Sequence, residues 1–215
     1  MTHKPVAVSL EQGFWITSDL HLGHRKVANM RGFDTAPDHD KAIMDNIMNT
    51  VAHGDTLIIL GDITLGRDLQ ALNMLKKLKR ELDLTLILAP GNHDLCHPIN
   101  KGKSITWFVE YSKVFDVIMQ NIVLSWKGVV LHMTHYPVWG SEAMNIDHEN
   151  LKGKKWCPEP PHNQAAIIHG HTHSATKIAP QHVNVALEAH KLHPIHSSQL
   201  TSYVAQAMNM PKKKK

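Results

Sequence analysis

The chain has 215 residues, of which 42% are apolar and 20% charged, so its composition is that of a globular protein and not of a disordered or fibrous one. This length suits one domain with a sizeable buried core. The formal net charge is +4, and the four lysines at residues 212–215 account for it. The rest of the chain is formally neutral, which argues against a broad nucleic-acid-binding face. We predict a single domain over residues 1–211, followed by a basic tail.

The sequence shows neither a membrane span nor a secretory signal. No apolar run approaches the roughly 18 residues that a transmembrane helix requires. The start, MTHKPVAVSLEQ, lacks the continuous apolar stretch of a signal peptide. We therefore expect a cytoplasmic protein. The two cysteines, Cys96 and Cys157, are not spaced as a CxxC pair, so we predict buried free thiols rather than a disulfide framework.

In the first half of the chain, short apolar runs alternate with amphipathic segments. Residues 14–18, 56–60 and 84–89 are rich in Ile, Leu and Thr, and we predict that they form buried strands. Between them, residues 38–52 carry apolar side chains at four-residue steps and residues 69–78 carry leucines at three-residue steps, as amphipathic helices do. The alternation of strand and helix predicts right-handed crossovers and a mainly parallel sheet.

The second half predicts hairpins and an antiparallel or mixed second sheet. Five strands and a closing helix are expected, at residues 115–119, 121–126, 129–133, 165–169, 182–189 and 197–208. Lys127 and Gly128 occupy a tight-turn position between two of these strands. The segment 136–164 is longer than an ordinary connection, so it is either a functional flap or a mobile loop.

Polar side chains that bind metals follow these strands. The runs DLH (19–21), GD (61–62) and GNHD (91–94) end the first three strands, and later strands end at His135 and at HGHTH (169–173). Ligands bind outside the carboxyl ends of strands in such sheets, so these groups are expected to converge. Each run alone is more often a turn or a satisfied core histidine. Five runs in order, each after an apolar strand, indicate one shared site.

This order of motifs resembles the calcineurin-like metallophosphoesterase superfamily, whose signature runs DxH, GD, GNHD or GNHE, H and GHxH. The resemblance spans residues 14–173, and every signature position is present. It implies an α/β fold, a four-layer αββα sandwich with two mixed sheets flanked by helices. It also implies a hydrolase of phosphoric ester bonds that uses two divalent metal ions.

The resemblance assigns seven metal ligands in two sets with one shared member: Asp19, His21 and His173 for one ion, Asn92, His135 and His171 for the other, and Asp62 for both. Imidazole and neutral oxygen ligands suit transition ions better than Ca²⁺ or Mg²⁺. We expect Mn²⁺, with Fe, Zn²⁺, Co²⁺ and Ni²⁺ as alternatives. The absence of a thiolate ligand disfavours a structural zinc finger.

Two such ions about 3.5 to 4 Å apart bind a phosphoryl oxygen and lower the pKa of a bridging water, whose hydroxide is the expected nucleophile. His93 is expected to stabilise the phosphoryl transition state and to protonate the departing alkoxide. Asp94, the next residue, is expected to fix the tautomer of that ring.

The remaining residues of HGHTH have expected roles as well. Gly170 is expected to adopt a backbone conformation that other residues resist and so to aim His171 and His173 at different ions. His169 lies outside the signature and is predicted to be structural or to support a ligand. His132, within its strand, is predicted to be packed or hydrogen-bonded.

Three side chains that follow the first two motifs either contact the substrate or begin solvated helices: His24, Arg25 and Arg67. The segment 136–164 contains Trp139 and Trp156, which supply either a stacking surface above the metals or a shield over the site.

The second and third motifs read GDITLGR and PGNHD, so they lack the arginines of GDxVDRG and RGNHE in the Ser/Thr phosphatases of the superfamily. The DLHLGH start and compact length resemble its small bacterial and phage phosphoesterases. We expect hydrolysis of a small phosphodiester, such as a cyclic nucleotide. The alternatives are a phosphomonoesterase, a nuclease and a non-catalytic scaffold, although the neutral body disfavours long nucleic acid and no signature residue is lost. The sequence does not predict the oligomeric state.

Overall fold

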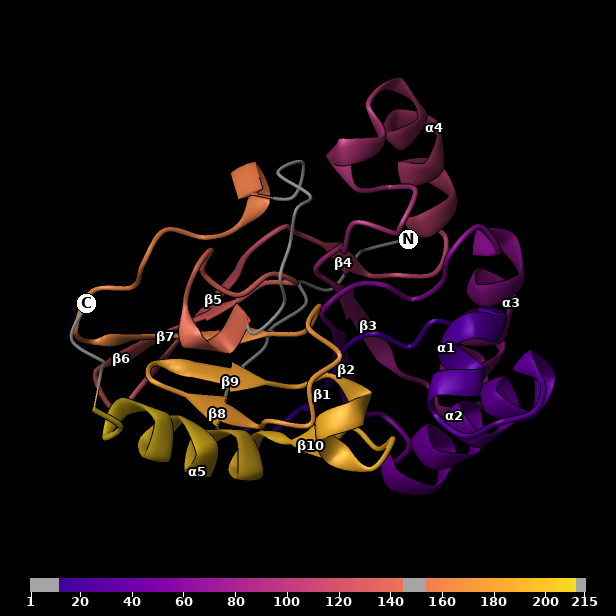
Figure 1. Ribbon diagram of the computed structural model, residues 1–215. Helices are drawn as coiled ribbons and strands as arrows, with labels where there is room; N and C mark the ends of the chain where they lie inside the picture. The colour runs from indigo at the N-terminus through magenta and orange to yellow at the C-terminus, as the bar shows by residue number, and fades with distance from the viewer. Residues whose placement is uncertain (1–11, 145–153, 212–215) are drawn as a thin grey trace.

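The computed structural model describes residues 12–144 and 154–211, which form two five-stranded sheets with helices packed around them (Figure 1). This arrangement confirms the predicted α/β fold with two mixed sheets. In the described part of the chain, every helix is too short or too polar to cross a lipid bilayer. The basic tail and residues 145–153 of the long connection lie outside the described residues.

The first sheet is built mainly from the apolar runs of the first half. Its order is β10-β1-β2-β3-β4. The strand bounds are β1 (Trp15–Thr17), β2 (Thr56–Ile59), β3 (Thr85–Leu88), β4 (Val117–Ile118) and β10 (Ile195–His196). β1 to β4 are parallel, whereas β10 pairs with β1 in the antiparallel sense. The parallel register brings the carboxyl ends of β1, β2 and β3 to one edge of the sheet.

The second sheet has the order β5-β6-β7-β9-β8. Its strand bounds are β5 (Ile122–Trp126), β6 (Val129–Met133), β7 (Ala165–His169), β8 (Ile178–Ala179) and β9 (His182–Asn184). β5 and β6 form the predicted hairpin, and Lys127 (φ 46°) and Gly128 (φ 78°) both take the left-handed conformation of a type I′ turn. β6, β7 and β9 are parallel, so His135 and residues 170–173 leave the sheet at the same edge.

The described residues contain five α-helices, with the bounds α1 (Arg25–Met30), α2 (Ala36–Thr50), α3 (Asp68–Leu82), α4 (Gly102–Tyr111) and α5 (Ser197–Met208). Figure 1 shows α1, α2 and α3 grouped on one side of the first sheet. The Thr35 side chain accepts a hydrogen bond from the Asp38 amide and so caps the start of α2. The apolar faces of α2 and α3 pack on this sheet through residues such as Ile43 and Leu75.

Alternate residues of the first sheet face two different cores, as the period of a strand requires. In β2, Leu57 and Ile59 pack against the helices, whereas Ile58 packs toward the second sheet. This second core also contains Ile168 of β7 and Leu200 of α5. Burial of each large apolar side chain contributes about 1.5–3 kcal/mol, so this core holds the two sheets together and fixes the edge where their motifs meet.

Two strand predictions are wrong in part. The run at residues 115–119 forms β4 of the first sheet, parallel to β3, and not part of a hairpin in the second sheet. The predicted strand at residues 182–189 ends at Asn184, and Leu187–His190 is a 3-10 turn. Four further elements, α1, α4, β8 and β10, were not predicted, because they are short or lack a clear apolar period.

Candidate metal centre

The candidate ligands have an unusual backbone conformation. Left-handed φ angles are uncommon for residues other than glycine and cost on the order of 1–3 kcal/mol each. Five of the seven candidate ligands have them: Asp19 (60°), His21 (49°), Asp62 (53°), His171 (70°) and His173 (48°). Each lies just after a strand, where the backbone turns sharply into the shared edge. Strain concentrated at these positions indicates that the site requires this geometry.

Glycines let the motif loops approach one another. A Cβ on Gly91 would lie 2.1 Å from Asp62 Oδ1, and a Cβ on Gly170 would lie 2.0 Å from Ser18 Oγ. Both distances are far below van der Waals contact. The prediction that Gly170 adopts a conformation closed to other residues is wrong, because its φ is not left-handed. A glycine is required there because a Cβ would clash with Ser18 and Asp19.

Asp19, His21 and His173 form the first cluster. Asp19 Oδ1 lies 3.9 Å from the Nε2 atoms of both His21 and His173, and these two nitrogens are 3.1 Å apart. The other carboxylate oxygen, Oδ2, accepts a hydrogen bond from the His171 backbone amide. Asp19 Oδ1 is buried without a hydrogen-bond partner among the described residues. The three atoms thus face a common point, as the ligands of one ion do.

Asp62, His135 and His171 form the second cluster, and Asn92 completes it. His135 Nε2 lies 3.4 Å from Asp62 Oδ2, 3.1 Å from His171 Nδ1 and 3.2 Å from Asn92 Oδ1. His135 Nδ1 donates to the Leu60 carbonyl at 2.8 Å, which leaves Nε2 for an ion.

Asp62 lies between the clusters. Its Oδ2 atom is 3.8 Å from His21 Nε2 and 3.4 Å from His135 Nε2, while Oδ1 accepts the His93 amide. Burial raises the pKa of Asp62, but the neighbouring His135, His21 and His93 imidazoles lower it well below its usual range. Burial lowers the pKa of His135, and Asp62 raises it by more, to about 9. Asp62 is thus an ionised carboxylate with one oxygen turned toward both clusters.

The donor set fits divalent transition ions. It consists of imidazole nitrogens, carboxylate oxygens and one amide oxygen, and no thiolate takes part. A buried carboxylate oxygen without a partner is unfavourable unless a cation compensates it, and Asp19 Oδ1 is such an atom. The structure therefore brings six of the predicted ligands together in two groups that could hold metal ions, and Asn92 adjoins the second group through its contact with His135.

Two residues that the sequence analysis missed brace the first cluster. Glu188 Oε1 accepts a hydrogen bond from His173 Nδ1 at 2.7 Å. Arg31, with only 3% of its side chain exposed, donates to the same oxygen at 2.6 Å and to the Asp19 carbonyl at 2.7 Å. Burial raises the pKa of Glu188, but His173 and Arg31 lower it to about 2. No motif spacing connects Arg31 in the turn after α1 with Glu188, so only the fold reveals the pair.

The predicted catalytic histidine lies at the mouth of the site. The His93 side chain is 36% exposed, and its Nε2 atom is 3.9 Å from Asp62 Oδ2. Asp94 does not support this ring as predicted. Its carboxylate accepts the backbone amides of Asp62, Ile63 and Gly91, and burial raises its pKa to about 7. Asp94 thus ties the ends of β2 and β3 together.

The three predicted substrate-contacting residues differ in how close they lie to the clusters. The His24 ring centroid lies 5.4 Å from that of His21, at the rim of the first cluster. Arg67 is exposed, and its stem lies beside Gly23, which precedes His24. Arg25 is exposed on α1 with Lys26, and no contact ties it to the clusters in the described residues.

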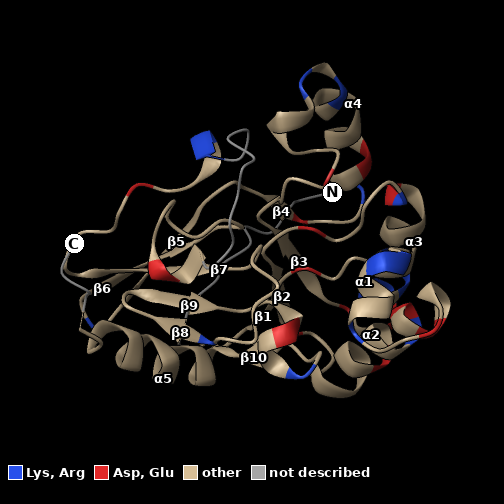
Figure 2. Cartoon of the chain, viewed as in Figure 1, with Lys and Arg blue, Asp and Glu red and all other residues tan. Residues whose placement is uncertain are grey.

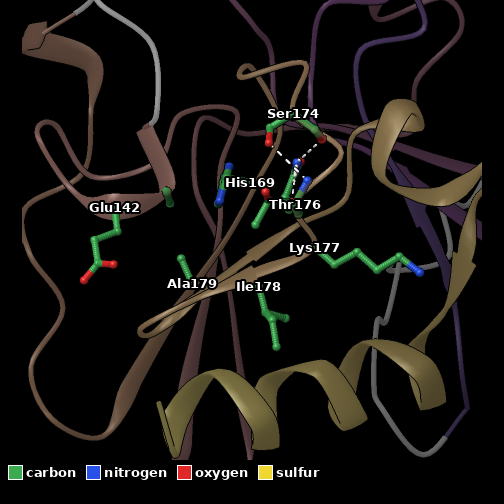
Figure 3. A pocket seen from close by; sticks show the side chains of 9 residues that line it. Glu142, His169, Ser174, Thr176, Lys177, Ile178 and Ala179 are labelled. Carbon is green, nitrogen blue, oxygen red and sulfur yellow. Dashed lines mark hydrogen bonds between the residues drawn. The ribbon is translucent and has the colours of Figure 1, made fainter. Parts of the chain in front are cut away.

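His169 and His132 lie outside both clusters, as predicted. His132 is hydrogen-bonded to Asn121 at 3.2 Å. His169 is 1% exposed and lines a pocket of only about 30 Å³, seen in Figure 3. On another wall of this pocket, Asn184 donates to the Ser174 and Thr176 carbonyls and fixes the chain after the last ligand. A pocket of this size holds about one water, so it is not a substrate site.

Comparisons with known proteins agree with this geometry. Residues 14–187 match the calcineurin-like phosphoesterase superfamily domain. The gene 66 protein of Mycobacterium phage D29 is 33% identical over 194 residues, which cover 84% of this chain and 91% of that protein. The gene 66 protein of Mycobacterium phage L5 is 28% identical over 169 residues, covering 74% and 77%.

A crystal structure of a protein of unknown function from Aquifex aeolicus shares the fold. Its TM-score is 0.61 at 21% identity, and the match covers 88% of this chain and 98% of that one. The family match extends from the residue before β1 to the first residue of the 3-10 turn after β9 and includes all seven candidate ligands. This chain belongs to the calcineurin-like phosphoesterase superfamily.

Proposed function

We propose that the protein hydrolyses small phosphodiesters, with nucleoside cyclic phosphates as the leading substrates, at a dinuclear metal centre formed by the two clusters. The observation that carries this proposal is the position of Asp62, whose Oδ2 atom lies within 4 Å of a ligand nitrogen in each cluster. A single carboxylate shared in this way links the clusters into one centre instead of two separate sites.

Divalent ions bound there would supply Lewis acidity toward phosphoryl oxygens and would acidify water near neutral pH. The chain holds the ligands in place without them. One oxygen of Asp19 accepts a hydrogen bond from the His171 backbone amide, and one oxygen of Asp62 accepts one from the His93 amide. The other oxygen of each carboxylate faces the clusters. This division makes the carboxylates rigid and keeps one oxygen available on each.

His93 is proposed to donate a proton to the departing alkoxide. Its ring reaches solvent at the mouth of the site, while its backbone amide is fixed on Asp62. A ring in this position contacts a phosphoryl group bound over the clusters without being a ligand itself. General acid catalysis of this kind contributes roughly 10²–10⁴ in rate.

The charge distribution favours a small diester as the substrate. Figure 2 shows basic and acidic residues interspersed along α1 to α4 and few charged residues along the strands of the second sheet. Binding of a long nucleic acid depends on many cationic contacts. A diester carries a single negative charge, which the centre and His93 can compensate without the arginine clamps of the protein phosphatases.

The test is a comparison of kcat/KM for three substrates with the Mn²⁺-reconstituted chain: a nucleoside 2′,3′-cyclic phosphate, an aryl phosphomonoester and single-stranded DNA. Each is measured at low and at moderate salt. We expect the cyclic phosphate to be preferred and its hydrolysis to vary little with salt. A preference for the monoester would indicate a phosphatase, and DNA cleavage that collapses as salt rises would indicate a nuclease.

A further inference from the structure

A cavity of about 340 Å³ lies beside the second cluster, at the carboxyl edge of the sheets. Three of its lining residues are close chain neighbours of candidate ligands, because Pro90 comes two positions before Asn92, and Thr134 and Tyr136 flank His135. Small-molecule sites span about 300–1,000 Å³, so this cavity is large enough for an organic group. The pocket beside His169 is not.

Aromatic rings connect the cavity with the second cluster. The Tyr136 ring centroid lies 4.9 Å from that of His135 and 4.8 Å from that of His171. On its other side, Tyr136 lies 6.0 Å from His97, which in turn meets Trp156 edge-on at 4.8 Å. A planar group in the cavity would therefore lie against aromatic rings a short distance from the metal centre.

The motif loop that carries the ligand Asn92 also builds a wall of the cavity. It continues through His93 and Asp94 to His97, whose backbone amide donates to the Asp94 carbonyl at 2.9 Å. Both ends of this loop are thus held by Asp94, through its side chain at the metal centre and its carbonyl at the cavity. A substrate that reaches from the metal centre into the cavity would cross this loop.

Two polar groups at the cavity need partners. The Tyr136 hydroxyl and Trp156 Nε1 are buried without a hydrogen-bond partner among the described residues. Buried donors are nearly always bonded in native structures, so each indicates a missing partner. Gln120 and Asn121 add amide donors and acceptors to the lining. Apolar ring faces combined with edge-on hydrogen-bonding groups are the features that recognise a nucleobase.

We propose that this cavity, the base subsite, binds the nucleobase of a nucleotide phosphodiester whose phosphate lies at the metal centre. The proposal rests on the proposed function, because that function places the phosphate. A second phosphate group is a poorer occupant, since Lys155 is the single Lys or Arg among the described lining residues. The base subsite would make the enzyme select nucleotides over other small diesters.

The test compares two substrates with the same scissile bond and the same leaving group, thymidine 5′-(4-nitrophenyl) phosphate and methyl 4-nitrophenyl phosphate. The Mn²⁺-loaded full chain is expected to hydrolyse the thymidine ester with a kcat/KM at least about tenfold higher, the scale on which a stacked base contributes to binding. Trp156→Ala is expected to reduce this ratio at least fivefold, a change within the same stacking scale, and Trp156→Phe to retain most of it.

Trp126→Ala is the matched control. Trp126 is also half-buried, but it lies at the far end of β5 from Asn121, so this variant is expected to keep the wild-type ratio. If Trp156→Ala does not fold, as judged by circular dichroism, Tyr136→Phe replaces it and removes one unpartnered hydroxyl. A wild-type ratio near one, or an equal fall in the ratio for Trp126→Ala, overturns the proposal.

A binding experiment separates the base subsite from the proposed function. In the His93→Ala background, calorimetry compares adenosine 5′-monophosphate with ribose 5-phosphate. Tighter binding of the nucleotide, lost on Trp156→Ala, supports the subsite even if neither diester is hydrolysed, in which case the proposed function alone fails. Equal affinity for the two ligands overturns the subsite whatever the hydrolysis results show.

Discussion

The two clusters contain similar ligands but are held in place by different means. In the first cluster, His173 is oriented by Glu188, which in turn is bonded to Arg31, so ionised side chains position the ligand. In the second cluster, His135 is oriented by the Leu60 carbonyl at the end of β2. Its ring is also packed edge-on against Tyr136.

In the proposed centre, the first cluster would therefore be the adjustable half and the second cluster the fixed half. A carboxylate that orients a histidine ligand also raises the basicity of that ligand. A backbone carbonyl and a packed ring fix the orientation with no charge of their own. Substitution of a supporting side chain should therefore lower the metal affinity of the first cluster and leave that of the second cluster unchanged.

Asp62→Ala is expected to have the largest effect, because it removes the residue that the two clusters share. Both ions should be lost, and turnover should fall to background. Metal content of the purified variant after reconstitution with Mn²⁺, measured by mass spectrometry, checks this result. A variant that still binds two ions would show that the clusters are independent.

His93→Ala should leave both clusters intact and affect the chemical step alone. Its ring lies at the mouth of the site, 3.9 Å from Asp62 Oδ2, and is assigned to the leaving group. We expect kcat to fall about 10²–10⁴-fold while metal content stays near two ions per chain. Metal analysis and steady-state kinetics on the same preparation check the result, and loss of the ions would contradict this assignment.

Glu188→Gln tests the comparison directly, since it should weaken the first cluster only. Loss of the charge that orients His173 is expected to reduce affinity for one ion about 10–100-fold, while the other ion stays bound. Stepwise metal titration by calorimetry distinguishes the two sites. Glu110→Gln is the matched control, because Glu110 is a partly exposed residue of α4 that pairs with Lys113 and does not contact either cluster. An equal loss of affinity for both ions would show that the two clusters do not differ in this way.

The smallest expected effect is a pH dependence of stability on the side of the second cluster. It arises at His97, whose ring packs on Tyr136, the neighbour of His135. Burial lowers the pKa of His97 to about 4 from an ordinary value of 6.5. The unfolded chain therefore binds a proton at this residue more readily than the folded protein, so stability falls as pH drops from 6.5 toward 4. Between pH 7 and pH 5 this residue should cost about 2 kcal/mol.

Urea unfolding with a chelator present, at pH 7 and at pH 5, measures this cost. His97→Asn keeps an acceptor for the Ile99 amide but lacks the titrating ring, so its unfolding free energy should vary less between the two pH values. An unchanged pH dependence in this variant would show that His97 does not titrate as its burial indicates.

Most of the candidate centre could be predicted from the sequence, because its ligands follow apolar strands and belong to recognisable motifs. Asp19, Asp62 and His135 are examples, each two or three positions after the end of β1, β2 or β6. The supporting residues could not be predicted. Arg31 follows a six-residue helix and Glu188 lies in a 3-10 turn, and neither has a periodic pattern or a motif nearby.

The errors have similar causes. Proximity in sequence suggests that Asp94 supports His93, but its buried carboxylate is saturated by three backbone amides from the loops after β2 and β3. Proximity to a hairpin likewise suggests that residues 115–119 belong to the second sheet, although pairing with β3 places them in the first sheet. In both cases, contacts between residues distant in sequence outweighed local proximity.

Gly170 determines how the two halves of the molecule meet. It belongs to the loop after β7 of the second sheet, and the atoms that a Cβ there would strike, Ser18 Oγ and Asp19 Oδ2, belong to the end of β1 in the first sheet. At this edge the Gly170 main chain therefore lies directly against the Ser18 and Asp19 side chains, and there is no room between them for a side chain on residue 170. The distance between the ligands from the two sheets is therefore set when the protein folds. An ion whose preferred bond lengths did not match this distance would have to distort the sandwich, so in the proposed centre the tolerance for ionic radius would be a property of the whole fold.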